Sequence, residues 1–257
     1  MRRALLLIFI ICFSFLSSIM VLSQELDFTG VARTGEEEAA AAEQELEQEF
    51  QVSIAISNKD YPVTPGDIYN LSYITAGELV SQQIIVENDY TLNLNIFGRL
   101  NAQNRTFSSI KPEVERKVEA AYPRSMPSLT ISSVGRFQVL LRGAVPQTRR
   151  VTAWGLSRLS DIVRGHLADY SSIRRVGVYS GNRYREYDLF KGLYQGEERE
   201  DPFISPGDVI EINRVQKIVE ISGAVNRPGR YQLLPGEDMG ELKEYIQGFS
   251  PDANLKR

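Results

Sequence analysis

An internal repeat in the C-terminal half constrains the fold of this chain more than any other feature. Segment 139–145 (VLLRGAV) is echoed by segment 219–225 (VEISGAV) at an offset of 80 positions. Segment 159–165 is echoed by segment 242–248 at an offset of 83. Because two landmarks recur in the same order, the chain is predicted to contain a duplicated module. Each copy reads as strand, turn, strand and a short helix closed by glycine, which predicts an α+β fold.

The two copies of the module differ in length. The first, residues 135–217, is expected to add a strand pair around a turn at 180–182 and a last strand after Pro206-Gly207-Asp208. The second, residues 218–257, reaches only as far as its helix. The chain is therefore either a fragment of a longer protein or carries an incomplete module whose open edge needs a partner strand. We expect this second copy to be the structured region least protected against hydrogen exchange.

Residues 58–134, before the repeat, are predicted to form a small β-rich domain with one helix near residues 109–122. Its segment 92–96 alternates apolar and Asn residues, so Leu92, Leu94 and Ile96 are expected to share one face of a strand. Pro228 and Gly229 are expected to form a type II turn, whose third position takes the positive φ that glycine allows. The residues expected in structural turns are Pro65, Gly66, Asp67, Gly143, Pro206, Gly207, Asp208, Gly223, Pro228 and Gly229.

The N-terminus, residues 1–23, has the pattern of a secretory signal peptide. Two arginines precede the apolar run 4–22, and Ser23 ends a stretch that suits signal peptidase. We predict cleavage after Ser23 and export; the alternative is an uncleaved anchor helix, because about 20 apolar residues can span a bilayer. Bulky residues at 9–11 precede Cys12, the only cysteine, and disfavour a lipidated N-terminus.

Residues 24–57 form an acidic, alanine-rich stretch. Between Glu36 and Phe50 there are seven Glu and no Lys or Arg. These like charges repel one another, and Leu46 with Phe50 is the main apolar pair at helical spacing. We therefore predict a solvated, frayed helix that acts as a tether, rather than a coiled-coil partner helix, which needs several sustained heptads.

The composition argues against nucleic-acid binding and catalysis. The chain has 29 Lys and Arg against 33 Asp and Glu, a formal net charge of −4, whereas nucleic-acid binding needs a basic surplus. His166 is the only histidine, and no nucleophile motif or phosphate-binding loop accompanies it. Asp201 and Asp208 could form a glycosidase pair of carboxylates, but a turn role is favoured for both. The chain is thus predicted to be non-enzymatic, without cofactor or metal.

Several of these segments resemble the bacterial outer-membrane polysaccharide export proteins. Segment 61–68 (YPVTPGDI) looks like the start of that family's N-terminal export domain. Segments 143–145 and 223–229 look like its soluble-ligand-binding β-grasp (SLBB) modules. The resemblance extends from about residue 60 to the C-terminus. It implies a small export domain at 58–134, one complete β-grasp-like module at 135–217 and a partial one at 218–257.

The resemblance also implies a function. It implies a non-enzymatic component of a capsule or exopolysaccharide export conduit, exported to the periplasm or to the periplasmic face of the outer membrane. The expected partners are polysaccharide, further copies of the chain in a homo-oligomeric ring, and an inner-membrane chain-length regulator. The alternative is a monomeric periplasmic module that binds a soluble ligand or glycan.

Arginines are dense around the first copy of the module. Arg142, Arg149 and Arg150 are candidate glycan contacts, because guanidinium groups bind carboxylates and phosphates. The alternative role of these arginines is to form salt bridges with the abundant Glu residues.

Overall fold

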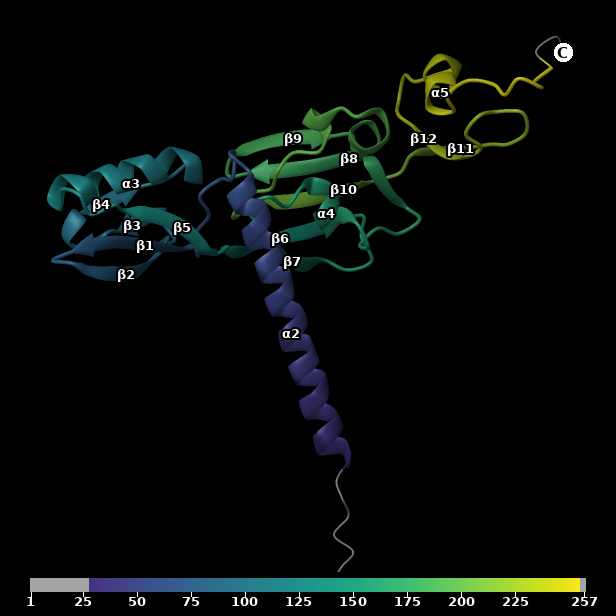
Figure 1. Ribbon diagram of the computed structural model, residues 1–257. Coiled ribbons are helices and arrows are strands. Elements are labelled where there is room, and N and C mark those ends of the chain that lie inside the picture. The colour runs from purple at the N-terminus through teal and green to yellow at the C-terminus, as the bar shows by residue number, and fades with distance from the viewer. Residues whose placement is uncertain (1–27, 255–257) are drawn as a thin grey trace, which may run out of the picture. The chain divides into compact units, whose positions relative to one another are not determined.

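The computed structural model describes residues 28–254, so the predicted signal peptide with Cys12 lies outside the described residues. Helices and mixed sheets alternate along the chain, and the predicted α+β class is confirmed (Figure 1). The trace divides into two units that meet between Gln48 and Glu49, and each unit is described by itself. Within residues 28–254, no helix combines the length and the apolar character that crossing a bilayer requires.

The acidic stretch forms helix α2, Phe28–Ser57, which is continuous over 30 residues. The side chains of residues 39–47 are exposed, as expected for a solvated tether. Beyond Gln48 the helix differs from that prediction: Gln51 and Ala55 are buried, and Val52 packs on the core of the next domain. The last two turns of α2 therefore belong to the domain that we predicted to begin at residue 58, because their small and apolar side chains can be buried while the Glu-rich turns cannot.

That domain contains two antiparallel sheets, the α-helix α3 and the last two turns of α2. The larger sheet has the strand order β2-β1-β5, the smaller sheet is the β3-β4 hairpin, and α3 follows. The bounds are Ile68–Thr75 for β1, Glu78–Ile85 for β2, Thr91–Asn93 for β3, Arg99–Asn101 for β4, Phe107–Ala121 for α3 and Ser128–Ser133 for β5.

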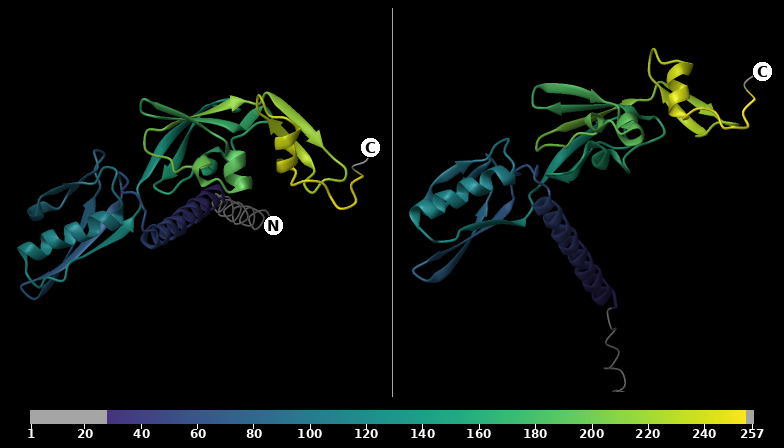
Figure 2. Two further views of the ribbon diagram at one scale, coloured as in Figure 1. Left: turned by 90° about the horizontal axis from the view of Figure 1, so that it is seen from above. Right: turned by 45° about the horizontal axis from the view of Figure 1, so that its top comes forward.

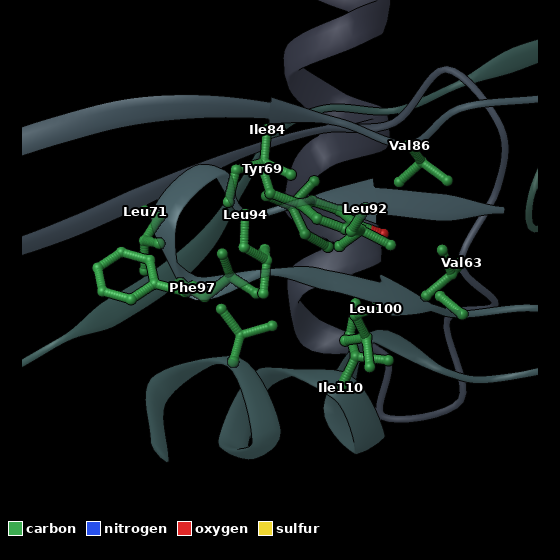
Figure 3. Close-up of a cluster of buried hydrophobic side chains, with 14 of the residues drawn as sticks. Val63, Tyr69, Leu71, Ile84, Val86, Leu92, Leu94, Phe97, Leu100 and Ile110 are labelled. Carbon is green, nitrogen blue, oxygen red and sulfur yellow. The ribbon is translucent and has the colours of Figure 1, made fainter. Parts of the chain in front are cut away.

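The core of this domain lies between the sheets and helix α3. Strand β1 alternates in burial, so Tyr69 and Leu71 point inward with Leu92 of β3 (Figure 3). Helix α3 contributes Ile110 and Val114, which are fully buried. Each such side chain contributes about 1.5–3 kcal/mol through its removal from water, so this core provides the main stabilisation of the domain.

The predicted strand at 92–96 is only partly correct. Strand β3 ends at Asn93, whose side-chain oxygen accepts the backbone N–H of Asn95 at 3.1 Å. Asn95 has a φ of 56°, a conformation that asparagine adopts more readily than most residues. The chain therefore turns, Ile96 becomes 72% exposed, and Phe97 enters the core instead.

The first copy of the module is a five-stranded sheet with the order β7-β6-β10-β8-β9. Its first strand β6 and last strand β10 are parallel and central, and the other neighbours are antiparallel. Helix α4 follows the first hairpin. The bounds are Arg136–Gly143 for β6, Arg149–Trp154 for β7, Leu159–Val163 for α4, Ser171–Ser180 for β8, Arg183–Tyr187 for β9 and Val209–Arg214 for β10.

The second copy consists of the β11-β12 hairpin and helix α5, which lies against the hairpin (Figure 2). Its local geometry repeats that of the first copy. Gly143 and Gly223 have φ values of 93° and 91°, and in each copy the N–H two residues later donates to the glycine carbonyl at 2.8 Å. The backbone after these two strands therefore has the same conformation in both segments. The bounds are Lys217–Ile221 for β11, Gly229–Leu233 for β12 and Met239–Tyr245 for α5.

The predicted type II turn at Pro228-Gly229 is wrong. Gly229 pairs with Ile221 as the first residue of β12, and its φ of 158° is far from the +80° of such a turn. Residues 222–228 instead form a longer loop. The N–H groups of Asn226 and Arg227 donate to carbonyls just after α5, at 3.1 Å each, and these bonds draw the loop away from a tight hairpin.

Candidate functional site

The two Pro-Gly-Asp segments form the same turn in different domains. Gly66 and Gly207 have φ values of 88° and 86°, as the third position of a type II turn requires. In each turn the Asp N–H donates to the carbonyl three residues earlier, at 3.0 Å for Asp67 and 3.1 Å for Asp208. Each Asp side chain in turn accepts that residue's N–H, at 2.9 and 2.8 Å. The predicted turn role of these residues is confirmed.

Replacing Gly207 with Val is expected to destabilise the first copy by about 1–3 kcal/mol, because a β-branched residue is strained at a φ of +86°. No atom lies within 4 Å of an added Cβ there, so the loss would come from backbone strain alone. Urea unfolding of the full chain measures the difference. Unchanged stability of Gly207→Val would contradict the turn assignment.

Asp67 has further partners that Asp208 lacks. Its Oδ1 accepts the Tyr61 hydroxyl at 2.7 Å and the Gly135 N–H at 2.6 Å, and its Oδ2 accepts the Tyr69 hydroxyl at 2.8 Å. The carboxyl is fully buried, and this burial raises its pKa despite the four donors. Asp67 is therefore a structural centre that joins β1 to the start of the first copy.

The other candidate catalytic groups are held by neighbours. The Asp201 carboxylate accepts the N–H and the hydroxyl of Ser160, both at 2.8 Å. The Nδ1 of His166 lies 3.4 Å from a guanidinium nitrogen of Arg149. Across residues 28–254, no group of three or more His, Cys, Asp or Glu side chains could hold a metal ion.

The three predicted glycan-contacting arginines do not converge on one point. Arg142 forms an ion pair with Glu211 at 2.7 Å and lies over the ring of Tyr179. Arg150 pairs in register with Leu140 and Arg149 with Leu141. Since neighbouring residues of a strand face opposite sides, Arg142 and Arg150 share one face of the sheet and Arg149 points to the other.

A different arginine, Arg174 of β8, links the two copies of the module. Its side chain is 1% exposed and forms ion pairs with Asp188 at 2.8 Å and Glu237 at 2.5 Å. Its guanidinium also donates to the carbonyl of Gln232 in β12 at 2.9 Å and to the hydroxyl of Tyr245 in α5 at 3.0 Å. Because three of these partners belong to the second copy, Arg174 anchors that copy to the first.

The charges around Arg174 perturb one another. Burial alone would raise the pKa of Glu237, but the hydrogen bonds from Arg174 and Tyr245 outweigh it and hold this pKa at about 2. Burial and the bond to Glu237 raise the pKa of Tyr245 to about 12. Both shifts favour an ionised Glu237 and a neutral Tyr245 at pH 7.

This linkage predicts an acid-sensitive contact between the copies. A carboxyl whose folded-state pKa is depressed stabilises the fold above its ordinary pKa, and that stabilisation is lost as the pH falls toward the folded value. For Glu237 the window runs from its ordinary pKa of 4.5 down to about 2. We expect the protection factor of the Leu233 amide, which is the intrinsic exchange rate at each pH divided by the observed rate, to fall across this window. The variant Glu237→Gln should lose most of that acid-dependent change.

A groove of about 600 Å³ lies beside this anchor. Four aromatic rings line it, and Phe190 is central, with ring centroids 5.1 Å from Tyr194 and 5.0 Å from Tyr245. A smaller hollow of about 260 Å³ shares part of its lining, so the depression is elongated. The lining residues of the larger groove are Ile173, Phe190, Tyr194, Asn226, Arg227, Pro228, Gly229, Arg230, Tyr231 and Tyr245.

No sequence pattern predicts this groove. Its residues come from β8, the segment after β9, the loop 222–228, β12 and α5, which are distant along the chain. The sequence feature that could have indicated the groove is the pair Arg227 and Arg230, which flank Pro-Gly and lie next to Tyr231.

Comparisons with known proteins do not assign this chain to a family. Neither a scan against protein-family models nor a search of curated proteins finds a match for this chain.

Proposed function

We propose that this chain is a non-enzymatic subunit of an envelope conduit that exports polysaccharide, as the family resemblance implies. The observation that carries the proposal is the tandem arrangement of the two module copies. The strand order of the first copy, with its first and last strands parallel at the centre, supports the interpretation as a β-grasp-like SLBB module. The matched backbone at Gly143 and Gly223 supports a second copy of the same module.

Subunits of such a conduit would assemble through contacts between different faces of neighbouring copies, closing a ring. The export domain and the modules would then form successive layers around the polysaccharide. The proposed location is the periplasm or the periplasmic face of the outer membrane, and the proposed neighbour is an inner-membrane chain-length regulator.

The groove favours the second candidate function, a monomeric periplasmic module that binds a soluble ligand. Its volume lies within the 300–1,000 Å³ that is usual for small-molecule sites, and aromatic side chains with a few polar groups line it. The two candidates differ in the mass of the particle in solution.

Light scattering and gene disruption test the proposed function together. We expect the full chain, expressed with its own N-terminal segment, to have the mass of several copies. Disrupting the gene should abolish surface polysaccharide, while the polysaccharide accumulates inside the cell envelope. A stable monomer whose loss leaves surface polysaccharide unchanged would refute the conduit and leave the ligand-binding module.

A further inference from the structure

We propose that the groove between the two copies of the module binds a segment of an acidic saccharide chain. This inference deepens the proposed function, on which it rests, by locating a contact with the exported material. This groove is a different place from the predicted glycan contacts Arg142, Arg149 and Arg150, which lie on β6 and β7.

The aromatic side chains supply a surface for sugar rings. Tyr194 is 59% exposed and its ring is tilted by 32° against that of Phe190, and Tyr231 meets Phe190 edge-on at 6.3 Å. The C–H groups on one face of a sugar ring pack well against the negative face of an aromatic ring. The groove is therefore suited to a ligand with both hydroxyl groups and apolar faces.

Two arginines supply uncompensated positive charge. Arg227 and Arg230 are exposed, and neither guanidinium has an ion pair or a hydrogen bond within the described chain. Arg174 beneath the groove differs, because Asp188 and Glu237 neutralise it. No carboxylate lines the larger groove, although Glu244 lies with Arg227 at an adjoining hollow. A ligand with carboxylate or phosphate groups would complement this charge.

The wall that carries Arg227 is held in place. The backbone N–H of Arg227 donates to the carbonyl of Ile246, and the backbone carbonyl of Arg227 accepts the Tyr231 hydroxyl at 2.6 Å. The side-chain amide of the neighbouring Asn226 donates to the carbonyl of Gln247 at 2.7 Å. Binding would therefore order only the side-chain ends, which keeps its entropic cost low.

The elongated shape favours a chain over a single sugar. The two hollows share Ile173, Phe190, Arg230 and Tyr231, so Arg230 stands between them. The smaller hollow adds apolar side chains, Leu167 and Ile218, and one carboxylate, Asp169. Acidic groups of the ligand are thus expected over the larger groove, next to Arg227 and Arg230.

Titration calorimetry with two saccharides of equal length tests the inference on the full chain. The probes are tetragalacturonate, with a carboxylate on every sugar, and neutral cellotetraose. We expect tetragalacturonate to bind more tightly, and Arg227→Gln or Arg230→Gln to weaken it by about tenfold each while reducing its salt dependence. Tyr194→Ala should weaken the binding of both saccharides. Arg183→Gln, an exposed arginine at the start of β9, should change the affinity by less than about twofold.

The inference would be overturned by the absence of tetragalacturonate binding, by equal binding of both saccharides, or by equal effects of Arg183→Gln and Arg230→Gln. A change in oligomeric state in Tyr194→Ala without any saccharide binding would also overturn it, because the groove would then be a subunit contact. If binding fails while the gene is still required for surface polysaccharide, the proposed conduit stands without this site. If binding succeeds while the gene is dispensable for export, the site stands and the conduit fails.

Discussion

Replacing Arg174 with Met should destabilise the chain by about 3–5 kcal/mol and release the second copy of the module from the first. The side chain is 1% exposed, and its removal leaves the buried Asp188 and the partly buried Glu237 without their cation. The bond to the Gln232 carbonyl would be lost at the same time. Urea unfolding measures the stability, and hydrogen exchange at Ile221 and Leu233 reports the release.

The neighbouring Arg175 provides a matched control. It belongs to the same strand but forms its ion pair with Glu186 at the surface, where both side chains are about one-third exposed. Arg175→Met should therefore cost less than about 1 kcal/mol, as is usual for exposed pairs. Equal losses in the two variants would show that Arg174 does not anchor the second copy.

Replacing Asp67 with Asn should destabilise the β-rich domain of residues 58–134 by about 2–4 kcal/mol. Each carboxylate oxygen accepts one backbone N–H and one tyrosine hydroxyl. Whichever way an Asn side chain is oriented, its NH₂ group faces a backbone N–H of Thr64 or Gly135, which cannot accept a hydrogen bond. Thermal unfolding of the full chain measures this loss.

The same substitution at Asp208 should be mild. One oxygen of Asp208 accepts the Ser205 N–H and the other accepts the Ser180 hydroxyl. An Asn can keep its oxygen toward the N–H and donate its NH₂ to the serine, which can also accept. If Asp67→Asn and Asp208→Asn unfold at the same temperature, the prediction is contradicted, because the two extra donors to Asp67 would then add nothing to the stability of the chain.

Much of the fold could be predicted because local patterns decide it. The repeat, the α+β class and the turns at Gly66 and Gly207 all follow from spacing and backbone preference within a few residues. Where a local pattern misled, a neighbouring contact was the cause. The positive φ of Asn95 turns the chain, so Ile96 lies outside the core. Hydrogen bonds from the loop before Pro228 to carbonyls just after α5 replace the tight turn that was predicted there.

The candidate site was less predictable because it depends on contacts between distant segments. Arg174 stood out in the sequence only as one of many arginines, and its partner Glu237 lies 63 positions later. Likewise, Phe190 and Tyr231 meet only because the second copy packs on the first. No periodicity or spacing rule encodes such a meeting. The glycan-contact role of Arg142, Arg149 and Arg150 stays a prediction.

The bond from Gly135 to Asp67 makes the hydrogen bonding of the first β-rich domain depend on a residue beyond its last strand. Gly135 lies beyond β5, the last strand of that domain, yet its N–H completes the set of four donors around the buried carboxyl. The space there is tight, since an added Cβ would lie 2.3 Å from the Pro65 carbonyl. While the chain emerges from the ribosome, this set of four donors is therefore incomplete until residue 135 has come through. A chain cut at residue 134 would contain every strand of that domain and still lack its last hydrogen bond.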